Sequence, residues 1–563
     1  MRVTVGRVRF WAIVMSAVLS SSSCTGLGVK QEETFRKSDP EATRGGRIRI
    51  GVAAPASIDP GVASDPSGML ISSLVCEPLI QIDPITGRLA NGMVESMVVG
   101  VQGSAFTIKL RNRIKFHNGQ TLSAQDVVYA LSRVSRHDFA GPRADVLSPI
   151  AGFEVINAPP PPTKDVDPEK RTLSGARVIS RTALEIALQE QNADFLTALS
   201  LPPAAPVPRG LPDRDKGFAD QPICAGPYRL TRPYRQGDPV IELHRFRDYY
   251  AKNRAFTAGG AGYPDVIEFH LISDRNVQMQ RFSEGQLDIA LVAPEKLGEA
   301  KLLGSQLVTT PVPAVEYIGL PAGQASFQDP EVRALLSRAI DRNKVVDEVF
   351  SGGRLPAGGF LPPIFGNRSA GACVSPGPAS AEAAPTALLG AKYEFKVNDD
   401  FSNLTLAEEV ATQWKQKLGL DISVVPMSWD KYVTEATGPR GIDGFFRESW
   451  IPPYPSIDEF LRPLFHSSEI GNNNFARFNS RTFDRRIDRV ARREQDEVLR
   501  QLKYFSLEEL LCRDLPMIPI TFGQEEYLVR VDRIGAASGD FFDRMSGQPL
   551  VRELFVRHAN DAA

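Results

Sequence analysis

The sequence lacks the surplus of positive charge that proteins binding nucleic acid normally carry. Its 65 lysines and arginines are balanced by 67 acidic residues, and the formal net charge is -2. A chain without a basic excess gains little from contacts with phosphates, so we expect no nucleic-acid partner. Long apolar runs are also missing. After the first 24 residues none reaches 18, the length that a membrane-spanning helix needs, so we expect that the mature chain does not span a membrane.

Short catalytic and metal-binding motifs are missing as well. The sequence has no G-x-S-x-G, no H-E-x-x-H and no phosphate-binding P-loop. No two of its six histidines share the spacing of metal ligands, and none of its five cysteines has the C-x-x-C spacing of a zinc site. We therefore predict a protein that is not an enzyme and has neither a catalytic residue nor a bound metal or cofactor.

The chain does have the composition that large cores require. Hydrophobic residues make up 42% of its 563 residues, which is typical of a globular and not of a disordered protein. The length suggests about three or four structural units. The 45 glycines and 43 prolines indicate many loops, as in a large mixed α/β protein.

Residues 1–23 have the pattern of an export signal. Arg2, Arg7 and Arg9 precede ten apolar residues, small residues follow, and Cys24 comes next. This order resembles a bacterial lipoprotein signal peptide, which implies cleavage and lipidation at Cys24. The usual apolar residue three places before the cysteine is Ser21 here, so an ordinary secretory signal is the alternative. Residues 24–45 are polar and are predicted to form a tether.

Four cysteines remain in the exported chain, at positions 76, 224, 373 and 512. An even number in an oxidising compartment can form two disulfides. Four cysteines allow three pairings, and their spacing does not choose between them. Buried unpaired thiols are the alternative.

Periodic patterns predict several helices and strands. Alternating apolar residues predict strands over residues 46–52, 106–110 and 182–188. Ser123 and Asp126 have the spacing of a capping box, and Asp329 before Pro330 predicts another helix start.

The second half of the chain has a strand–helix–strand order. A strand over 393–397, a helix that ends at Gly419 and a strand over 421–425 predict a parallel pair with a crossover. Residues 482–512 are predicted as a helix and 515–522 as a strand.

The stretch from Asp443 to Phe460 is the most distinctive in the chain. It begins with two phenylalanines and continues into a loop that holds Trp450, two prolines and Tyr454. Such a loop can offer aromatic faces and backbone groups to an extended ligand. Packing of both aromatic residues in a core is the alternative for each residue taken alone.

Several separated motifs resemble family 5 of the extracellular solute-binding proteins, the oligopeptide- and dipeptide-binding components of ABC importers. The blocks, in the family's order, are Phe106-Thr-Ile-Lys-Leu-Arg111, Lys115-Phe-His-Asn-Gly119, Ser123-Ala-Gln-Asp-Val127, Gly226-Pro-Tyr228, Gly285-Gln-Leu-Asp-Ile289, Asp329-Pro-Glu-Val-Arg-Ala334, Ala339-Ile-Asp-Arg342 and Ser449-Trp450 with residues 455–460. The resemblance covers roughly residues 46–530.

The resemblance implies an α/β fold of the two-lobe periplasmic-binding-protein type (type II). Lobe one would hold residues 46–308, with an extra subdomain over 79–214, and lobe two residues 309–514. Residues 515–563 would return to lobe one. This partition places Cys76 and Cys224 in lobe one and Cys373 and Cys512 in lobe two. It therefore favours disulfides 76–224 and 373–512, which leave the hinge free.

The resemblance also implies where a ligand binds. The family holds peptides in extended form through backbone pairing, as in strand addition. The segments expected to do this are the loop with Ser57 and Ile58 and the stretch with Glu448, Trp450 and Tyr454. Arg447 is a candidate partner for a ligand carboxylate.

One family feature is missing from this stretch. Peptide-binding members commonly carry an aspartate shortly after the tryptophan, for the ligand's ammonium group, and here the aligned place falls near Pro452 or Pro453. Glu448 or Asp458 could substitute, although Asp458 is more easily explained as a helix cap.

These features predict a lipid-anchored, monomeric solute-binding protein outside the cytoplasm that delivers peptides to an ABC permease. One alternative keeps the fold and binds an oligosaccharide, haem or a metal complex. Another is a regulatory envelope lipoprotein without a role in transport, and a weaker one is a secreted hydrolase.

Overall fold

The computed structural model describes residues 39, 41–84, 87–100, 103–139, 141–159, 171–214, 217–251, 262–320, 325–366, 373, 388, 391–494 and 496–557. The predicted signal peptide and Cys24 lie outside these residues. Residues 41–45, the last of the predicted tether, contact the folded body. Gly45 N–H donates to the Tyr263 carbonyl at 2.9 Å, and Glu41 pairs with Arg557. The last residues of the predicted tether are therefore bound to the body.

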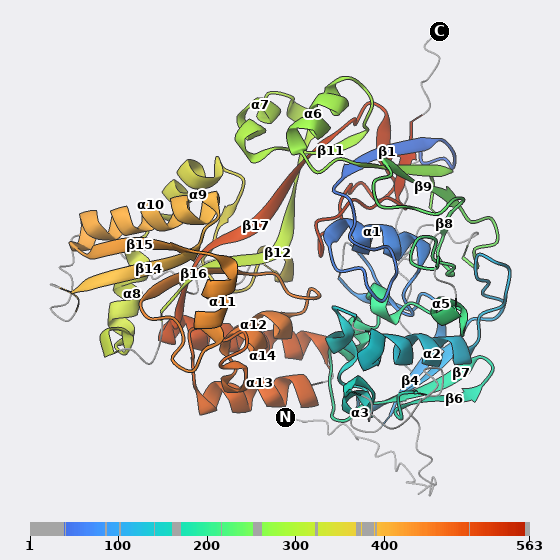
Figure 1. Ribbon diagram of the computed structural model, residues 1–563, viewed down its shortest axis with the longest axis horizontal. Helices are drawn as coiled ribbons and strands as arrows, with labels where there is room; N and C mark the ends of the chain where they lie inside the picture. Colours follow the sequence, from blue (N-terminus) through green and yellow to red (C-terminus); the bar gives the residue numbers. More distant parts are fainter. Residues whose placement is uncertain are drawn as a thin grey trace, which may run out of the picture.

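One mixed sheet of eleven strands runs through most of the molecule (Figure 1). Its order is β15-β14-β16-β12-β17-β11-β1-β10-β9-β8, with β13 paired to β17. The bounds are β1 Arg47–Val52, β8 Tyr228–Leu230, β9 Val240–Arg245, β10 Val266–Leu271, β11 Ile289–Leu291, β12 Leu307–Gly319, β13 Leu355–Pro356, β14 Lys392–Asn398, β15 Asp421–Met427, β16 Phe445–Trp450 and β17 Met517–Val529. Figure 1 shows β12 and β17 as long ribbons between the left and right halves.

A separate antiparallel sheet, in the order β4-β5-β7-β6, forms a smaller unit at the lower right of Figure 1. We call it the four-stranded unit. Its elements are β4 Val94–Val99, β5 Ala105–Leu110, α2 Ala124–Ser135, α3 Phe153–Asn157, β6 Ala176–Ser180, β7 Ala183–Ala187 and α4 Phe195–Ala198. Short elements nearby are β2 Gln81–Ile82, β3 Leu89–Ala90, α5 Leu211–Arg214 and the 3-10 helices His137–Phe139, Ala144–Leu147 and Pro202–Ala204.

The remaining helices cover the two halves of the main sheet. They are α1 Pro66–Val75, α6 Arg275–Ser283 and α7 Leu297–Lys301 in the first half, and α8 Pro330–Arg338, α9 Arg342–Phe350, α10 Phe401–Leu418, α11 Trp429–Thr437, α12 Ile457–Phe465, α13 Arg481–Arg493 and α14 Glu497–Asp514 in the second. A short pair, β18 Ile534–Ala536 and β19 Leu554–Val556, lies near the C-terminus.

Two helix signals in the sequence are confirmed. Ser123 N–H donates to Asp126 Oδ2 at 2.8 Å in the capping box of α2, and Asp329 accepts from the Glu331 N–H at the start of α8. Residues 482–512 are helical as predicted, and they form two helices, α13 and α14. Asp496 caps α14 by accepting the Leu499 N–H at 2.9 Å.

The buried apolar residues form separate cores. One core, around Ile48, Ile50 and Phe269, packs β1, β9 and β10, and we call this part the first lobe. A second, around Phe395, Trp414 and Phe445, packs the strands and helices from β14 to α14, and we call this part the second lobe. The four-stranded unit has its own core. Helix α2 contributes to this core and to the first lobe's core, so the unit is attached to the first lobe.

Two disulfides lie inside these cores. Cys76 is bonded to Cys224, and Cys373 to Cys512. The first pair is buried in the first lobe's core, and the second packs in the core of the second lobe. This is the pairing that the two-lobe partition favours. Among the described residues no helix is both long and apolar enough to cross a membrane.

Candidate functional site

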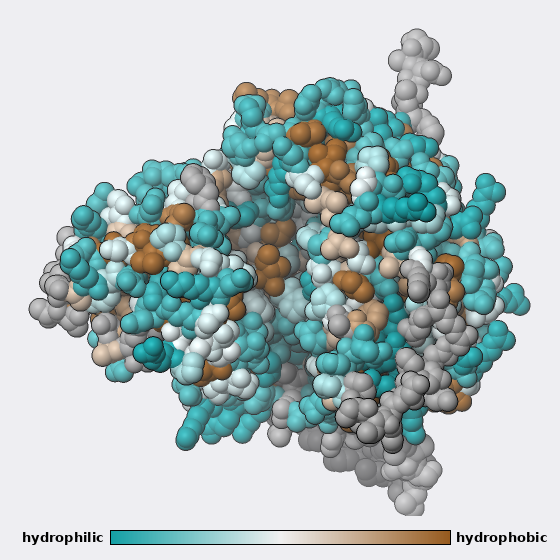
Figure 2. Space-filling model, in the orientation of Figure 1, coloured by the Kyte–Doolittle hydropathy of each residue, from teal (hydrophilic) through white to brown (hydrophobic). Residues whose placement is uncertain are grey.

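Parallel strands in both lobes end at loops that are candidates for ligand contact. β1 is parallel to β10 and β11, and β14 is parallel to β15 and β16. Ligands of open α/β sheets bind outside the carboxyl ends of such strands. The loop after β1 holds Ser57 and Ile58. Strand β16 itself holds Arg447, Glu448 and Trp450, and the loop after it holds Tyr454. Figure 2 shows the surface hollowed between the left part, which carries α8 to α11, and the right part, which carries α1.

One guanidinium brings these two loops together. Arg143, which precedes the 3-10 helix Ala144–Leu147, donates from Nη1 to the Pro453 carbonyl at 2.7 Å. Its Nη2 donates to the Ser64 carbonyl at 3.2 Å. Ser64 lies on the segment between β1 and α1, and Pro453 lies on the loop after β16. No local sequence pattern indicates this role of Arg143, because its partners are 79 and 310 residues away.

A buried ion pair fixes the loop after β1. Arg133 of α2 donates from Nη1 and Nη2 to the two carboxylate oxygens of Asp59, at 3.0 and 2.6 Å. Ser57 is partly exposed, and its hydroxyl accepts the Asp59 N–H at 3.2 Å. The side chain of Ile58 is 1% exposed in the first lobe's core, which leaves its backbone for the predicted contact with a ligand.

Trp450 lies at the end of β16, opposite Val315 of β12. Its side chain is partly buried against the second lobe's core, and its indole N–H donates to the Glu459 carbonyl at 2.6 Å. This hydrogen bond fixes the ring against α12. The next residue, Ile451, is 68% exposed, so the loop after β16 presents an apolar side chain to solvent.

Glu448, the acidic residue of β16, has one carboxylate oxygen without a hydrogen-bond partner among the described residues. Its Oε1 accepts the Ser449 N–H at 2.8 Å, while its Oε2 is buried and unpaired. Burial raises the pKa of this carboxyl above its ordinary value. The residue opposite on β12 is Tyr317, whose own pKa is raised first by burial and then by the Glu448 charge. A cation beside Oε2 would stabilise the ionised carboxylate and offset the free-energy cost of its burial.

Arg447 is not the free cation that was predicted for a ligand carboxylate. Its Nε donates to Glu316 Oε1 of β12 at 2.7 Å, and its Nη2 contacts the same oxygen. Glu316 Oε2 in turn accepts the Thr521 hydroxyl of β17 at 2.9 Å. Arg447 therefore joins three neighbouring strands of the sheet.

Tyr454 is also placed differently from the prediction. Its side chain is 8% exposed and packs in the core of the four-stranded unit. Burial, followed by the charge of Glu459, raises its pKa well above the ordinary value. Tyr454 thus reaches from the second lobe into the unit attached to the first lobe, instead of lining an open cleft.

Asp458 cannot substitute for the family's missing aspartate. Its Oδ2 accepts from Arg462 Nε at 2.8 Å, and its Oδ1 accepts the Tyr504 hydroxyl at 3.0 Å. The residue is 8% exposed on α12. Of the two acidic candidates, Glu448 alone keeps an unpaired oxygen within the part of the chain that the structure describes.

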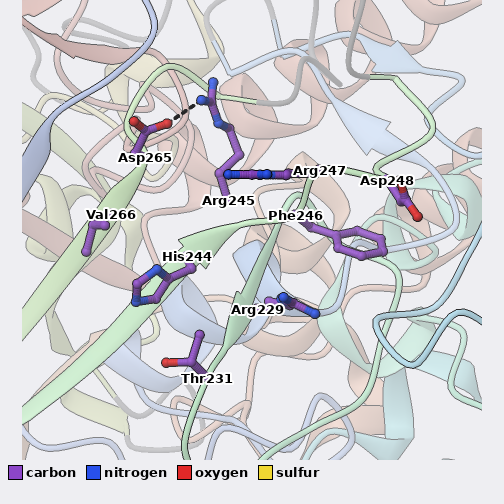
Figure 3. Close-up of a pocket in the computed structure, with 9 residues that line it drawn as sticks. All are labelled: Arg229, Thr231, His244, Arg245, Phe246, Arg247, Asp248, Asp265 and Val266. Carbon is purple, nitrogen blue, oxygen red and sulfur yellow. Dashed lines mark hydrogen bonds and ion pairs between the residues drawn. The ribbon is translucent and has the colours of Figure 1, made fainter.

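A basic depression of about 740 Å³ lies elsewhere, at the outer strands β8 to β10 (Figure 3). Arg245 pairs there with Asp265, as the dashed line in Figure 3 marks, and Arg229, His244 and Arg247 also line it. It is remote in the strand order from β12, β16 and β17. No group of three or more metal-ligand side chains occurs among the described residues.

The sequence profile described as "Bacterial extracellular solute-binding proteins, family 5 Middle" matches residues 88–472. The dipeptide-binding protein DppE of Bacillus subtilis is 25% identical to this chain over 77% of the chain and 79% of that protein. The periplasmic oligopeptide-binding protein OppA of Salmonella typhimurium is 24% identical over 80% and 82% of the two chains.

Solved structures share the fold. The unliganded open form of the periplasmic murein tripeptide binding protein MppA superposes with a TM-score of 0.74 at 20% identity, over 91% of this chain and 97% of that one. The oligopeptide-binding protein AppA of Bacillus subtilis, solved with a nonapeptide, gives a TM-score of 0.63 at 17% identity, over 92% and 99% of the two chains. The predicted two-lobe α/β fold is confirmed.

Proposed function

The chain belongs to family 5 of the bacterial extracellular solute-binding proteins, and from this premise we propose that it captures peptides between its two lobes and delivers them to the permease of an ABC importer. The observation that carries the proposal is the bridge that Arg143 makes between Ser64 and Pro453. It brings together two loops that follow parallel strands of different lobes. A ligand held between these loops would touch both lobes and would stabilise their closed arrangement.

Peptides are the ligand class that the relatives support. The curated proteins that match most of this chain are named as dipeptide-, oligopeptide- and glutathione-binding proteins. An extended peptide suits loops that offer backbone groups, because pairing between backbones does not depend on the ligand's side chains. Water in the surrounding space would accommodate different side chains. The protein performs no covalent chemistry in this scheme and acts as a monomer.

The proposed lobes have the bounds that the family resemblance implies. Lobe one comprises residues 46–308 with the subdomain 79–214, lobe two comprises residues 309–514, and residues 515–563 return to lobe one. In support, β12 and β17 pair with each other and connect the two halves of the sheet. The C-terminal end of β17 pairs with β11 of the first half. The C-terminal part of β12 pairs with β16 of the second half, and β17 also pairs with β13. Relative motion of the lobes would occur where these two strands cross between them.

Glu448 is the residue that we assign to the ligand's ammonium group. It lies two residues before Trp450, and its Oε2 is buried with no hydrogen-bond partner among the residues that the structure describes. An ammonium group would supply the missing hydrogen bond and would lower the pKa of this carboxyl. Ser57, the backbone of Ile58 and Trp450 would contact the rest of the ligand.

The proposed location is outside the cytoplasm, with a lipid on Cys24 holding the protein at the membrane. The family is extracellular, and residues 1–23 have the pattern of an export signal. The mass of the N-terminal fragment from the exported protein tests the anchor. A diacylglyceryl mass on Cys24 that is lost in the Cys24→Ser variant would support it, and an unmodified N-terminus would refute it.

Binding can be tested with the purified protein, first freed of co-purifying ligand by partial unfolding and refolding. A panel of di- to pentapeptides, an oligosaccharide, haem and a nickel chelate would each be added during thermal unfolding. A bound ligand raises the Tm by mass action, and 100 times its Kd stabilises the fold by about 2.7 kcal/mol. We expect peptides alone to raise the Tm. A rise with haem, sugar or the chelate, and none with any peptide, would overturn the peptide assignment.

A further inference from the structure

The four-stranded unit and the second lobe meet at a contact that is rich in carboxyl groups. We call it the cross-lobe contact and define it by Arg143, Asp145 and Asp194 on the unit and residues 453–459 with Arg500 on the second lobe. Four interactions among the described residues hold it. Tyr454 is buried in the unit's core, Ser456 donates its hydroxyl to Asp194 Oδ2 at 2.9 Å, and Arg143 binds the Pro453 carbonyl. Arg500 Nε lies 4.0 Å from Asp194 Oδ1.

The carboxyl groups of this contact outnumber the cations that could neutralise them there. Asp194 and Asp458 are 9% and 8% exposed, and Glu459 follows directly in the chain. Arg462 is held by Asp458 and by Asp488 of α13, at 2.8 and 3.0 Å. The titratable and charged groups around Glu459 are Arg143, Asp145 and Asp194 from the unit, Tyr454, Asp458 and Arg462 from the loop and α12, Arg500 and Tyr504 from α14, and Asp488 from α13.

We propose that the cross-lobe contact is a proton-dependent latch, in which protons held by Asp194 and Glu459, beside Asp458, keep the four-stranded unit against the second lobe and their loss lets the lobes separate. The latch would act on the closure that the proposed function requires, but it does not depend on which ligand binds. Nothing in the ligand contacts described above uses these three carboxyl groups.

The charges from the opposite lobe give the coupling between protonation and separation. Burial, and then the charge of Asp458, raise the pKa of Glu459 to about 8, and Asp194 and Asp145 of the unit add to the shift. Burial, and then Asp458 of the second lobe, raise the pKa of Asp194 to about 6. When the lobes part, both groups regain water and each loses the carboxylates of the opposite lobe, while Asp458 stays beside Glu459. Each pKa therefore falls toward the ordinary value.

The sign of the pH dependence follows from these shifts. A carboxyl whose pKa is raised in the contact binds its proton more tightly there than when the lobes are apart. The contact is therefore most stable below the ordinary carboxyl pKa of about 4. It weakens as the pH rises through about 6 for Asp194 and about 8 for Glu459. One linked proton changes the closed-to-open ratio by up to about tenfold per pH unit.

The experiment measures the distance between the lobes without any ligand, so it does not depend on whether peptides bind. Spin labels on Ser180→Cys in the four-stranded unit and Gln416→Cys in α10 would report that distance, because both positions are exposed. Double electron–electron resonance from pH 5.5 to 9 should show one short distance at pH 5.5 and a growing longer one above pH 6.

Two neutral variants and one control test whether these carboxyl groups hold the latch. Glu459→Gln and Asp194→Asn each remove an ionisable proton site but keep a polar side chain of the same size, so each should retain the short distance to a higher pH. Glu408→Gln on the exposed face of α10 should behave as the parent. A distance that is independent of pH in the parent would overturn the proposal. An opening midpoint that stays at the parental pH in both variants would overturn it as well.

Discussion

At the scale of single residues, Glu448 and Arg447 show how neighbours on one strand acquire different roles. The two side chains point to opposite faces of β16 because strand residues alternate. Arg447 meets Glu316 of β12 and is neutralised inside the sheet. Glu448 has no ion pair of this kind within the described part of the chain, and its Oε2 remains unpaired there. The sequence shows both charges, but only the strand register shows which one is already paired.

The assignment of Glu448 predicts a selective effect on ligands with a free ammonium group. Glu448→Gln should weaken binding of an unmodified tripeptide about tenfold or more, because a hydrogen bond to a charged group contributes about 1.5–3 kcal/mol. It should leave the N-acetylated form of the same peptide almost unchanged. Isothermal titration calorimetry of both peptides against both proteins measures this difference. Equal losses for the two peptides would mean that Glu448 supports the fold and does not contact the ammonium group.

Residues that act across large sequence separations are the ones that local patterns miss. The bidentate pair of Arg133 and Asp59 joins positions 74 apart, and Ser456 and Asp194 are 262 apart. Tyr454 has a local pattern that fits exposure in a loop, yet its neighbours come from a sheet formed hundreds of residues earlier. No local periodicity encodes such contacts.

At the scale of elements, the sequence predicts most where the cause is local. The strand over 106–110 is confirmed as β5, since its alternate apolar residues are buried on one face. Gly419 ends α10 with φ of 71°, a left-handed conformation that favours glycine. The parallel pair of β14 and β15 is confirmed too. The boundary between α13 and α14 falls in a run of polar residues, 492–497, which is also compatible with the exposed face of a continuous helix. Asp496 marks the new start by accepting the Leu499 N–H.

The disulfides connect elements within one core each, which predicts that they stabilise the fold without restricting closure. Each closes a loop of more than 130 residues, and the loss of such a cross-link costs typically 2–5 kcal/mol. Cys76→Ala/Cys224→Ala and Cys373→Ala/Cys512→Ala should each lower the Tm by several degrees. Peptide affinity, measured by calorimetry below the Tm, should change less than twofold. A large loss of affinity at unchanged Tm would show that a disulfide constrains the binding geometry.

At the scale of the whole molecule, the two lobes are linked by an irregular part of the pair β12 and β17. The register shifts between Pro311 and Val315, where Gln524 and Phe522 are the partners on β17. Pro311 and Pro313 have no N–H to donate to the ladder. The regular pairing on one side of this point continues to β11, and on the other side to β16. A short interruption between two well-paired regions is the place where the sheet can bend with the smallest loss of hydrogen bonds.

Gly523 lies opposite this interruption, and its lack of a side chain permits the close approach of the strands. A Cβ at Gly523 would be 2.4 Å from Val312 Cγ2 and 2.8 Å from Ala314 Cβ. Gly523→Ala should therefore force the strands apart at the point between the lobes and alter the angle at which they close. We expect peptide affinity to fall about tenfold, with a changed distance between labels on the two lobes.

A second-site change separates this bend from a general loss of stability. Gly523→Ala/Val312→Ala removes the nearer of the two groups that the new Cβ would meet and leaves Ala314 Cβ at 2.8 Å, so it should recover part of the affinity. Gly298→Ala in α7, where no neighbour lies within 4 Å of the added Cβ, is the matched control and should bind like the parent. If Gly523→Ala binds normally and keeps the parental distance, the lobes do not move about this part of β12 and β17, and their motion has to be sought elsewhere in the fold.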